Sequence, residues 1–79
     1  MRDYGFEYKE IKLTEAQRNA LIANSGTYYR KYDAKVAQVY FRGEPQDAYA
    51  IYYLYGSGWD RAYYLDEAKL NGVFERFAA

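Results

Sequence analysis

Cysteine and histidine are both absent from this chain of 79 residues, and each absence excludes a class of chemistry. Without cysteine the chain can form no disulfide and has no thiolate nucleophile. Without histidine it lacks the commonest general base and the commonest zinc ligand. A hydroxyl nucleophile needs a base beside it, so the following residues are interpreted as helix-cap and turn residues: Thr14, Ser25, Thr27 and Ser57. We therefore expect no enzyme activity, no cofactor and no metal site.

Long apolar runs are also missing, and so is a net charge of either sign. No stretch approaches the roughly 20 apolar residues that a membrane-spanning helix needs, and the N-terminus has no apolar signal-peptide core. These absences predict a cytoplasmic protein without membrane contact. The 11 basic and 11 acidic residues cancel, which argues against a surface that is basic all over. Residues 14–42 nevertheless carry a positive excess, and residues 43–79 carry a negative one.

Aromatic residues are plentiful, at 22% of the chain, and they can enlarge the core of a domain this small. Residues 48–64 hold half of the 12 tyrosines and the single tryptophan, divided by Gly56-Ser57-Gly58. Two aromatic runs around such a turn predict a β-hairpin with a three-residue loop. In that hairpin we expect one large aromatic face, built from four facing pairs: Tyr55–Trp59, Tyr53–Arg61, Ile51–Tyr63 and Tyr49–Leu65.

The N-terminal third predicts a strand followed by a helix. Aromatic residues alternate with other residues up to about Ile11, as in a half-buried strand: Tyr4, Phe6 and Tyr8. Thr14 with Gln17 forms a capping-box pattern, and the helix should end near Asn24 because Ser25-Gly26 follows. We expect the buried stripe of this helix to consist of alanines flanked by Leu21: Ala16, Ala20 and Ala23.

Residues 27–42 allow two interpretations. As a helix, they would place Tyr28, Tyr32 and Val36 on one stripe, and Ser25-Gly26 would become the turn of a helix-turn-helix. As a loop followed by a strand, they would place Ala37, Val39 and Phe41 on one face. The β-branched and aromatic residues at the end of the segment favour the strand. We therefore prefer a tyrosine-bearing loop at 27–33 and a strand after it.

The C-terminal half predicts a turn, the hairpin and a second helix. Gly43-Glu44-Pro45-Gln46 has the composition of a turn, and Asp66 is a typical N-cap for the helix. The expected apolar stripe of that helix is Leu70, Val73, Phe74 and Phe77, and Gly72 suggests a close approach to a strand. The chain is thus predicted to be a single α+β domain spanning 1–79, an antiparallel sheet of three to four strands with two helices on one face, in the order β-α-β-β-β-α.

The leading functional expectation is a small non-catalytic module that binds a protein or protein complex. Tyrosine, tryptophan and arginine are the residue types enriched at interface hot spots. The expected partner-binding residues lie on the hairpin and in the segment before the second strand: Tyr53, Tyr55, Trp59, Arg61, Tyr28, Tyr29, Arg30, Lys31 and Lys35. Blocking a larger complex by occupancy needs no catalytic group, so an inhibitor encoded by a mobile genetic element, of the phage anti-defence kind, fits the small size and missing chemistry.

Nucleic acid is the alternative partner. The segment Tyr28–Lys35 mixes aromatic and basic residues, the combination that binds single strands by stacking and phosphate contact. Arg42 would extend that basic surface. A homodimer is left open, because dimerisation would bury further area in a domain with a small core.

Overall fold

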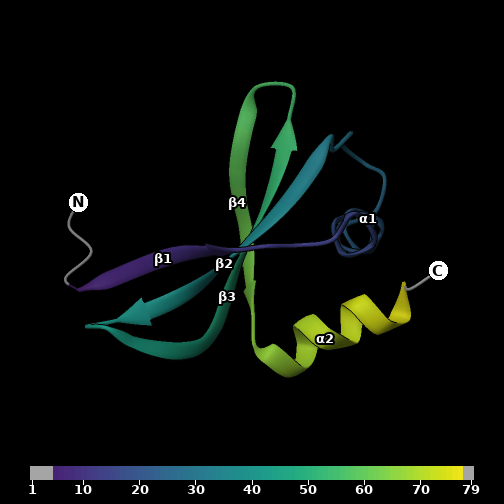
Figure 1. Cartoon of the computed structure of the whole chain (residues 1–79). Helices are drawn as coiled ribbons and strands as arrows, with labels where there is room; N and C mark the ends of the chain where they lie inside the picture. The colour runs from purple at the N-terminus through teal and green to yellow at the C-terminus, as the bar shows by residue number, and fades with distance from the viewer. Residues whose placement is uncertain (1–4, 78–79) are drawn as a thin grey trace.

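Four strands form one antiparallel sheet in the order β1-β2-β3-β4, and two helices cover one of its faces (Figure 1). The structure is a computed structural model that describes residues 5–77. Its elements are β1 (Phe6–Ile11), α1 (Glu15–Asn24), β2 (Asp33–Phe41), β3 (Glu44–Tyr55), β4 (Gly58–Leu65) and α2 (Glu67–Arg76). The predicted fold class and element order are confirmed, and so is the loop-plus-strand interpretation of residues 27–42. Tyr4, assigned to the first strand from the sequence, lies outside the described residues.

The turn between β2 and β3 is not where the sequence predicted it. Arg42 and Gly43 alone connect the two strands. Their φ values of 51° and 83° are both positive, as a tight two-residue hairpin turn requires. The predicted turn at 43–46 is therefore wrong, because the turn residues are 42 and 43 and β3 begins at Glu44. Pro45 lies inside β3, opposite Tyr40, in a section of β3 that does not pair with β4. A proline is tolerated there because that section is locally an edge.

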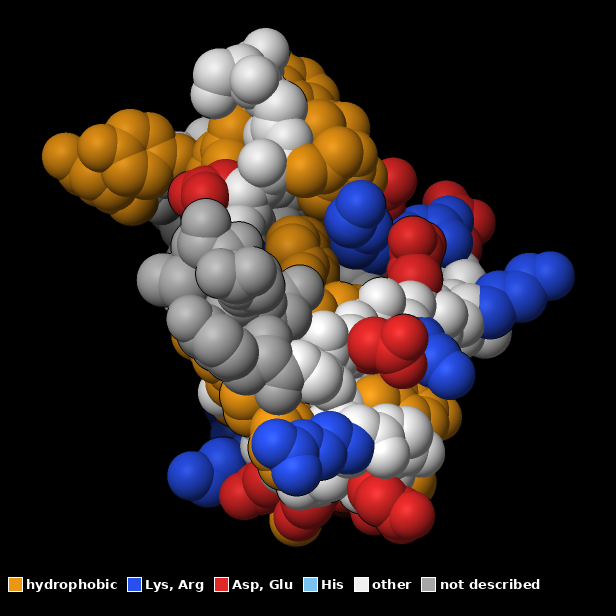
Figure 2. Space-filling view, turned by 90° about the vertical axis from the view of Figure 1, so that its left-hand side faces the viewer, with side chains coloured by type: hydrophobic (Ala, Val, Ile, Leu, Met, Phe, Trp, Pro, Cys, Tyr) orange, Lys and Arg blue, Asp and Glu red, His pale blue; other side chains and the backbone are white. Residues whose placement is uncertain are grey.

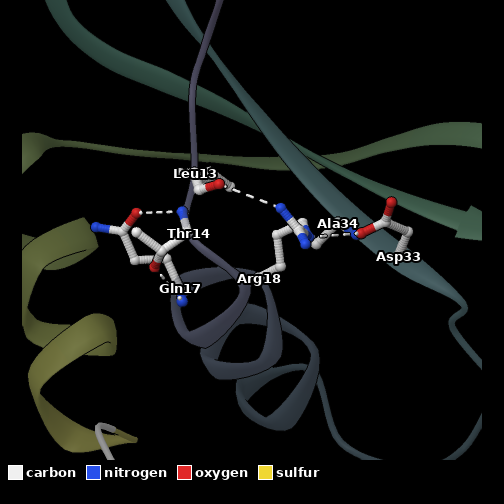
Figure 3. A network of polar contacts seen from close by, with 6 residues as sticks. All are labelled: Leu13, Thr14, Gln17, Arg18, Asp33 and Ala34. Atoms are coloured by element: carbon white, nitrogen blue, oxygen red, sulfur yellow. Dashed lines mark hydrogen bonds and ion pairs between the residues drawn. The ribbon is translucent and has the colours of Figure 1, made fainter.

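The start of α1 is fixed by the predicted capping box (Figure 3). The backbone N–H of Gln17 donates to Thr14 Oγ1 at 3.1 Å, and the backbone N–H of Thr14 donates to Gln17 Oε1 at 3.0 Å. Arg18 then joins the helix to the sheet, since its Nε lies 3.3 Å from a carboxylate oxygen of Asp33 at the start of β2. Gly26, with a φ of 82°, follows the C-cap Ser25 and ends the helix as expected.

The buried stripe of α1 differs from the predicted alanine stripe. Ala20 and Leu21 are buried, whereas Ala16 and Ala23 are exposed. The helix is rotated so that Leu21 points at the sheet, because burying a leucine side chain removes much more apolar surface from water than burying an alanine methyl group.

The second helix, α2, begins at the predicted N-cap. A carboxylate oxygen of Asp66 accepts the backbone N–H of Lys69 at 2.8 Å. Asp47 of β3 accepts the backbone N–H of Glu67 at 2.7 Å, which ties the helix start to the sheet. The predicted stripe is confirmed only in part: Leu70 and Val73 are buried, Phe74 is half-buried and Phe77 is exposed. Phe77 is the C-cap residue and lies past the end of the helix at Arg76.

The core between the helices and the sheet is closed by a tyrosine. Tyr53 of β3 is fully buried, and its hydroxyl donates to the carbonyl oxygen of Leu21 at 2.9 Å. A hydroxyl has one hydrogen, so Tyr63 must donate to the Tyr53 oxygen across their 2.7 Å contact. The buried members of this core are Ala20, Leu21, Ala34, Val36, Ile51, Tyr53, Leu70 and Val73.

We expect Tyr53→Phe to lower the free energy of unfolding by about 1–3 kcal/mol, because the Tyr63 hydroxyl loses its acceptor and the Leu21 carbonyl oxygen keeps only the Ser25 backbone N–H as a donor. Burial raises the pKa of Tyr53 above the ordinary tyrosine value. The folded state thus holds this proton more tightly than the unfolded state. The corresponding stability is complete below a pH of about 10 and declines as the pH rises above it. Denaturant titrations below and above that pH should show a steeper alkaline loss in the wild type than in Tyr53→Phe; equal losses would contradict the assigned burial.

Gly72→Ala is expected to stabilise the protein by about 0.5–1 kcal/mol. The predicted close approach of Gly72 to a strand is wrong, since an added Cβ would meet no atom within 4 Å. Alanine should therefore gain the usual helix propensity at no steric cost. Thermal and denaturant unfolding measure the change, with the exposed residue Ala68→Gly as the reverse control. A loss of stability in Gly72→Ala would show that the helix packs more closely than described.

Candidate functional site

The tip of the β3–β4 hairpin differs from the predicted register. Only Gly56 and Ser57 form the loop, because Gly58, with a φ of 125°, already pairs with Tyr55. The predicted three-residue loop is therefore wrong, and so are the predicted pairs at the tip. Trp59 lies opposite Leu54, and Arg61 lies opposite Tyr52.

A β-bulge at Ala62 restores the predicted register further along the hairpin. The pairing shifts between Ile51 and Tyr52, so that Ile51 faces Tyr63 and Tyr49 faces Leu65, as predicted. Side chains alternate between the faces of a strand, and one extra residue reverses that alternation. The bulge consequently moves the side chains of Trp59 and Arg61 away from the helices, to the opposite face of the sheet.

That opposite face has no helix over it and carries an aromatic and cationic surface, which we call the open face. It contains six residues from all four strands: Tyr8, Lys35, Tyr52, Trp59, Arg61 and Tyr64. Beneath them lie three small buried residues that do not belong to the main core: Ala37, Val39 and Ala50. Trp59 keeps 42% of its surface exposed and Tyr64 keeps 45%, so the open face presents large rings to solvent.

The two cations of the open face lie over its rings. Lys35 Nζ is 4.5 Å from the centre of the Trp59 ring and 5.5 Å from that of Tyr52. The Arg61 guanidinium is 5.2 Å from the Tyr64 ring, and beyond it the hydroxyls of Tyr8 and Tyr64 are hydrogen-bonded at 3.1 Å. The predicted facing pair of Arg61 and Tyr53 is wrong, because the bulge places Arg61 opposite Tyr52. Cation–π contacts of this kind hold flat rings in place while leaving one side of each ring free.

Within residues 5–77, no carboxylate forms an ion pair with Lys35 or Arg61. The one ion pair closer than 4.0 Å in that part of the chain joins Arg18 and Asp33. The nearby Tyr64 ring raises the pKa of Arg61, and partial burial followed by the hydrogen bond with Tyr8 raises the pKa of Tyr64. Tyr64 therefore stays neutral and Arg61 stays charged throughout the physiological range.

A shallow hollow of about 190 Å³ lies beside Lys35 on the open face. Ala37 forms its floor, Tyr8 and Tyr52 form its walls, and Lys35 and Glu10 lie at its rim. The hollow exists because Ala37 is small, whereas the neighbouring strands carry the rings of Tyr8 and Tyr52 at the same level. It is suited to receive one side chain of a partner rather than an extended ligand.

A second exposed group lies at the same end of the sheet, in the loop between α1 and β2. We call residues 28–32 the tyrosine loop. Tyr28 is 87% exposed, Tyr29 is 63% exposed and Tyr32 is 58% exposed. Tyr29 packs edge-on against Tyr55 at 6.4 Å, and Lys31 Nζ donates to the Tyr29 carbonyl oxygen at 3.0 Å.

The tyrosine loop and the hairpin tip enclose a second, wider hollow of about 320 Å³, lined by Tyr29, Tyr55, Ser57 and Asp60. This hollow opens on the helix side of the hairpin, whereas Trp59 faces the other side. Figure 2 shows hydrophobic side chains gathered near the top of the molecule, where Figure 1 places the hairpin tip, with Lys and Arg side chains close by. The tip thus presents aromatic residues on both of its sides.

The residues expected from the sequence are divided by the structure. Tyr53 is a core residue, 1% exposed, and cannot contact a partner without unfolding. Trp59, Arg61 and Lys35 lie together on the open face, whereas Tyr55, Tyr28, Tyr29, Arg30 and Lys31 lie on the helix side of the tip. Three open-face residues were missed: Tyr8, Tyr52 and Tyr64. Alternation along the first strand and the hairpin could have placed them on one face, but only the bulge brings Trp59 and Arg61 to them.

No family model, curated protein or solved structure matches this chain. Among residues 5–77, no three acidic side chains lie close enough together to hold a metal ion. In the same part of the chain neither helix has the length and apolar character needed to cross a membrane.

Proposed function

We propose that this chain is a non-catalytic protein-binding module that docks on a larger protein through its open face. The observation that carries the proposal is the position of Trp59 and Arg61, which the bulge at Ala62 places beside Lys35 on a face without helices. Rigid aromatic rings lose little conformational entropy on docking. Their contacts with Lys35 and Arg61 hold them in position before a partner arrives.

The charge of the open face favours a protein partner over nucleic acid. Two cations lie among its rings, and Glu10 lies at the rim of its hollow. The whole chain has no net charge, whereas a surface that follows a phosphate backbone needs several cations and few acids. A partner surface that matches the open face would carry one apolar side chain with a carboxylate on each side of it. The carboxylates would pair with Lys35 and Arg61, and the apolar side chain would enter the hollow over Ala37.

An inhibitor that acts by occupancy would use the same surface. Such a protein needs a rigid docking face and no reaction chemistry. The buried network of Tyr53 and Tyr63, together with the floor of small residues under the open face, supplies that rigidity.

Paired charge variants test the proposal. The immobilised protein is used to capture partners from host extract, in parallel with Lys35→Gln and Lys69→Gln. Lys69 is exposed on α2, so both variants lose one positive charge from the surface. We expect proteins retained by the wild type to be retained by Lys69→Gln and weakened by Lys35→Gln, more so at low salt. Equal retention by both variants would exclude the open face as the docking surface.

The nucleic-acid alternative is tested with random single-stranded oligonucleotides. The tyrosine loop offers Arg30 and Lys31 beside exposed rings, which is the feature that would favour it. Binding that falls steeply with salt, and that is lost when Arg30, Lys31 and Lys35 are all replaced by glutamine, would replace the protein-binding proposal. We expect no such binding.

A further inference from the structure

Among residues 5–77, no strand pairs with the outer edge of β1. The helices pack on β2, β3, β4 and each other, and Figure 1 shows β1 extending away from them. Its pairing with β2 is regular over six residue pairs, without the bulge that distorts the other edge strand, β4. A regular exposed edge presents unpaired N–H and C=O groups to another strand.

The direction of these unpaired groups follows from the ladder with β2. The backbone N–H of Arg42 donates to the carbonyl oxygen of Gly5 at 2.8 Å, so this facing pair is a hydrogen-bonded one. Hydrogen-bonded and non-hydrogen-bonded pairs alternate along an antiparallel ladder. The odd-numbered residues Glu7 and Lys9 therefore bond to β2. The backbone groups of the even-numbered residues point outward: Phe6, Tyr8 and Glu10.

We propose that a second copy of this chain adds to this edge, with the two β1 strands antiparallel about a two-fold axis at Tyr8. Each Tyr8 then donates its backbone N–H to the carbonyl oxygen of the other. Glu7 of each copy lies opposite Lys9 of the second copy, so the same charge pair forms twice. This complementarity selects a second copy as the occupant, because an acid and a base, Glu7 and Lys9, stand on either side of Tyr8 in the strand FEYKEI.

Neighbouring registers do not share this match. A two-fold axis at Glu7 would place the two Glu7 carboxylates opposite each other, and an axis at Lys9 would do the same with two ammonium groups. A two-fold axis between two residues would place the outward-pointing backbone groups of one copy opposite backbone groups of the other copy that are already bonded to its own β2. Neither Glu7 nor Lys9 takes part in an ion pair within residues 5–77. Lys9 Nζ lies 4.4 Å from the centre of the Tyr40 ring, a cation–π contact that leaves its charge without a carboxylate partner.

The pairing would join two four-stranded sheets into one of eight strands. Facing residues of adjacent strands share a face, so both pairs of helices lie on one side and both open faces lie on the other. Phe6 and Tyr8, which are 42% and 38% exposed, lose surface at the join. The proposal is independent of the protein-binding function: a monomeric chain could still use one open face.

Charge reversal tests the register. Sedimentation analysis of the wild type should give twice the mass of the 9.3 kDa chain at high concentration. Glu7→Lys alone and Lys9→Glu alone should each weaken association by about tenfold or more, because like charges then face each other. An equimolar mixture of the two variants should associate again, since the new basic side chain of the first variant meets the new acidic side chain of the second. Circular dichroism confirms that each variant is folded.

A backbone variant gives a second, independent readout. Glu10→Pro removes an N–H that points outward, so the ladder with β2 stays intact while the dimer loses two hydrogen bonds, one from each copy. We expect a folded protein with the mass of one chain. A wild type that stays monomeric at millimolar concentration would overturn the proposal, as would a dimer that persists unchanged in Glu7→Lys, Lys9→Glu and Glu10→Pro.

Discussion

Leu21→Ala is expected to lower the free energy of unfolding by about 3–5 kcal/mol. Leu21 is 0% exposed and lies at the centre of the contact between α1 and the sheet. Its carbonyl oxygen also accepts the Tyr53 hydroxyl, so a shift of the helix would disturb the buried tyrosine pair. Small domains have a total stability of the same order, so much of the variant should be unfolded at 37 °C.

Ile22→Ala is the matched control for this effect. Ile22 is the next residue along α1, it has the same number of side-chain carbon atoms, and it is only half-buried. Denaturant titration should therefore show a clearly smaller loss for Ile22→Ala than for Leu21→Ala. Equal losses would mean that the helix is rotated toward the predicted alanine stripe.

Trp59→Ala is expected to weaken partner binding by about 2 kcal/mol or more, which is roughly a 30-fold rise in the dissociation constant. Trp59 contributes the largest ring of the open face and holds Lys35 at 4.5 Å, so truncation removes contact area and releases the cation together. Its effect on unfolding should be much smaller than that of Leu21→Ala, because 42% of the residue is exposed.

Phe77→Ala provides the control for Trp59→Ala. Phe77 is exposed to a similar degree, at 37%, but it lies at the end of α2, on the helix side of the sheet. Calorimetric titration of a captured partner should give wild-type affinity for Phe77→Ala. Loss of affinity in Phe77→Ala with normal affinity in Trp59→Ala would assign binding to the helix side instead.

Local signals in the sequence identified the elements of the fold. Thr14 with Gln17 marked the start of α1, and Asp66 marked the start of α2, because each side chain satisfies backbone donors a few residues away. The β-branched and aromatic residues at the end of β2 likewise favoured the strand. These signals act over one helical turn or one strand, so a single sequence contains them completely.

The candidate site depends on features that are not local. No residue type marks the bulge at Ala62 in the sequence. The bulge lies between the pair Tyr63–Ile51 and the pair Arg61–Tyr52. A uniform register, assumed from the sequence, placed Trp59 and Tyr53 on the same face. In the structure Tyr53 is enclosed by the helices while Trp59 lies on the open face.

The binding proposal depends most directly on the position of Trp59. Solution NMR can determine that position without a partner. We expect nuclear Overhauser effects between the Trp59 indole protons and the side chains of Lys35 and Leu54. The Lys35 ε-methylene protons should move upfield, because they lie over the indole ring. Contacts from the indole to Leu21 or to Tyr63 would instead place Trp59 under the helices, and they would contradict the open face.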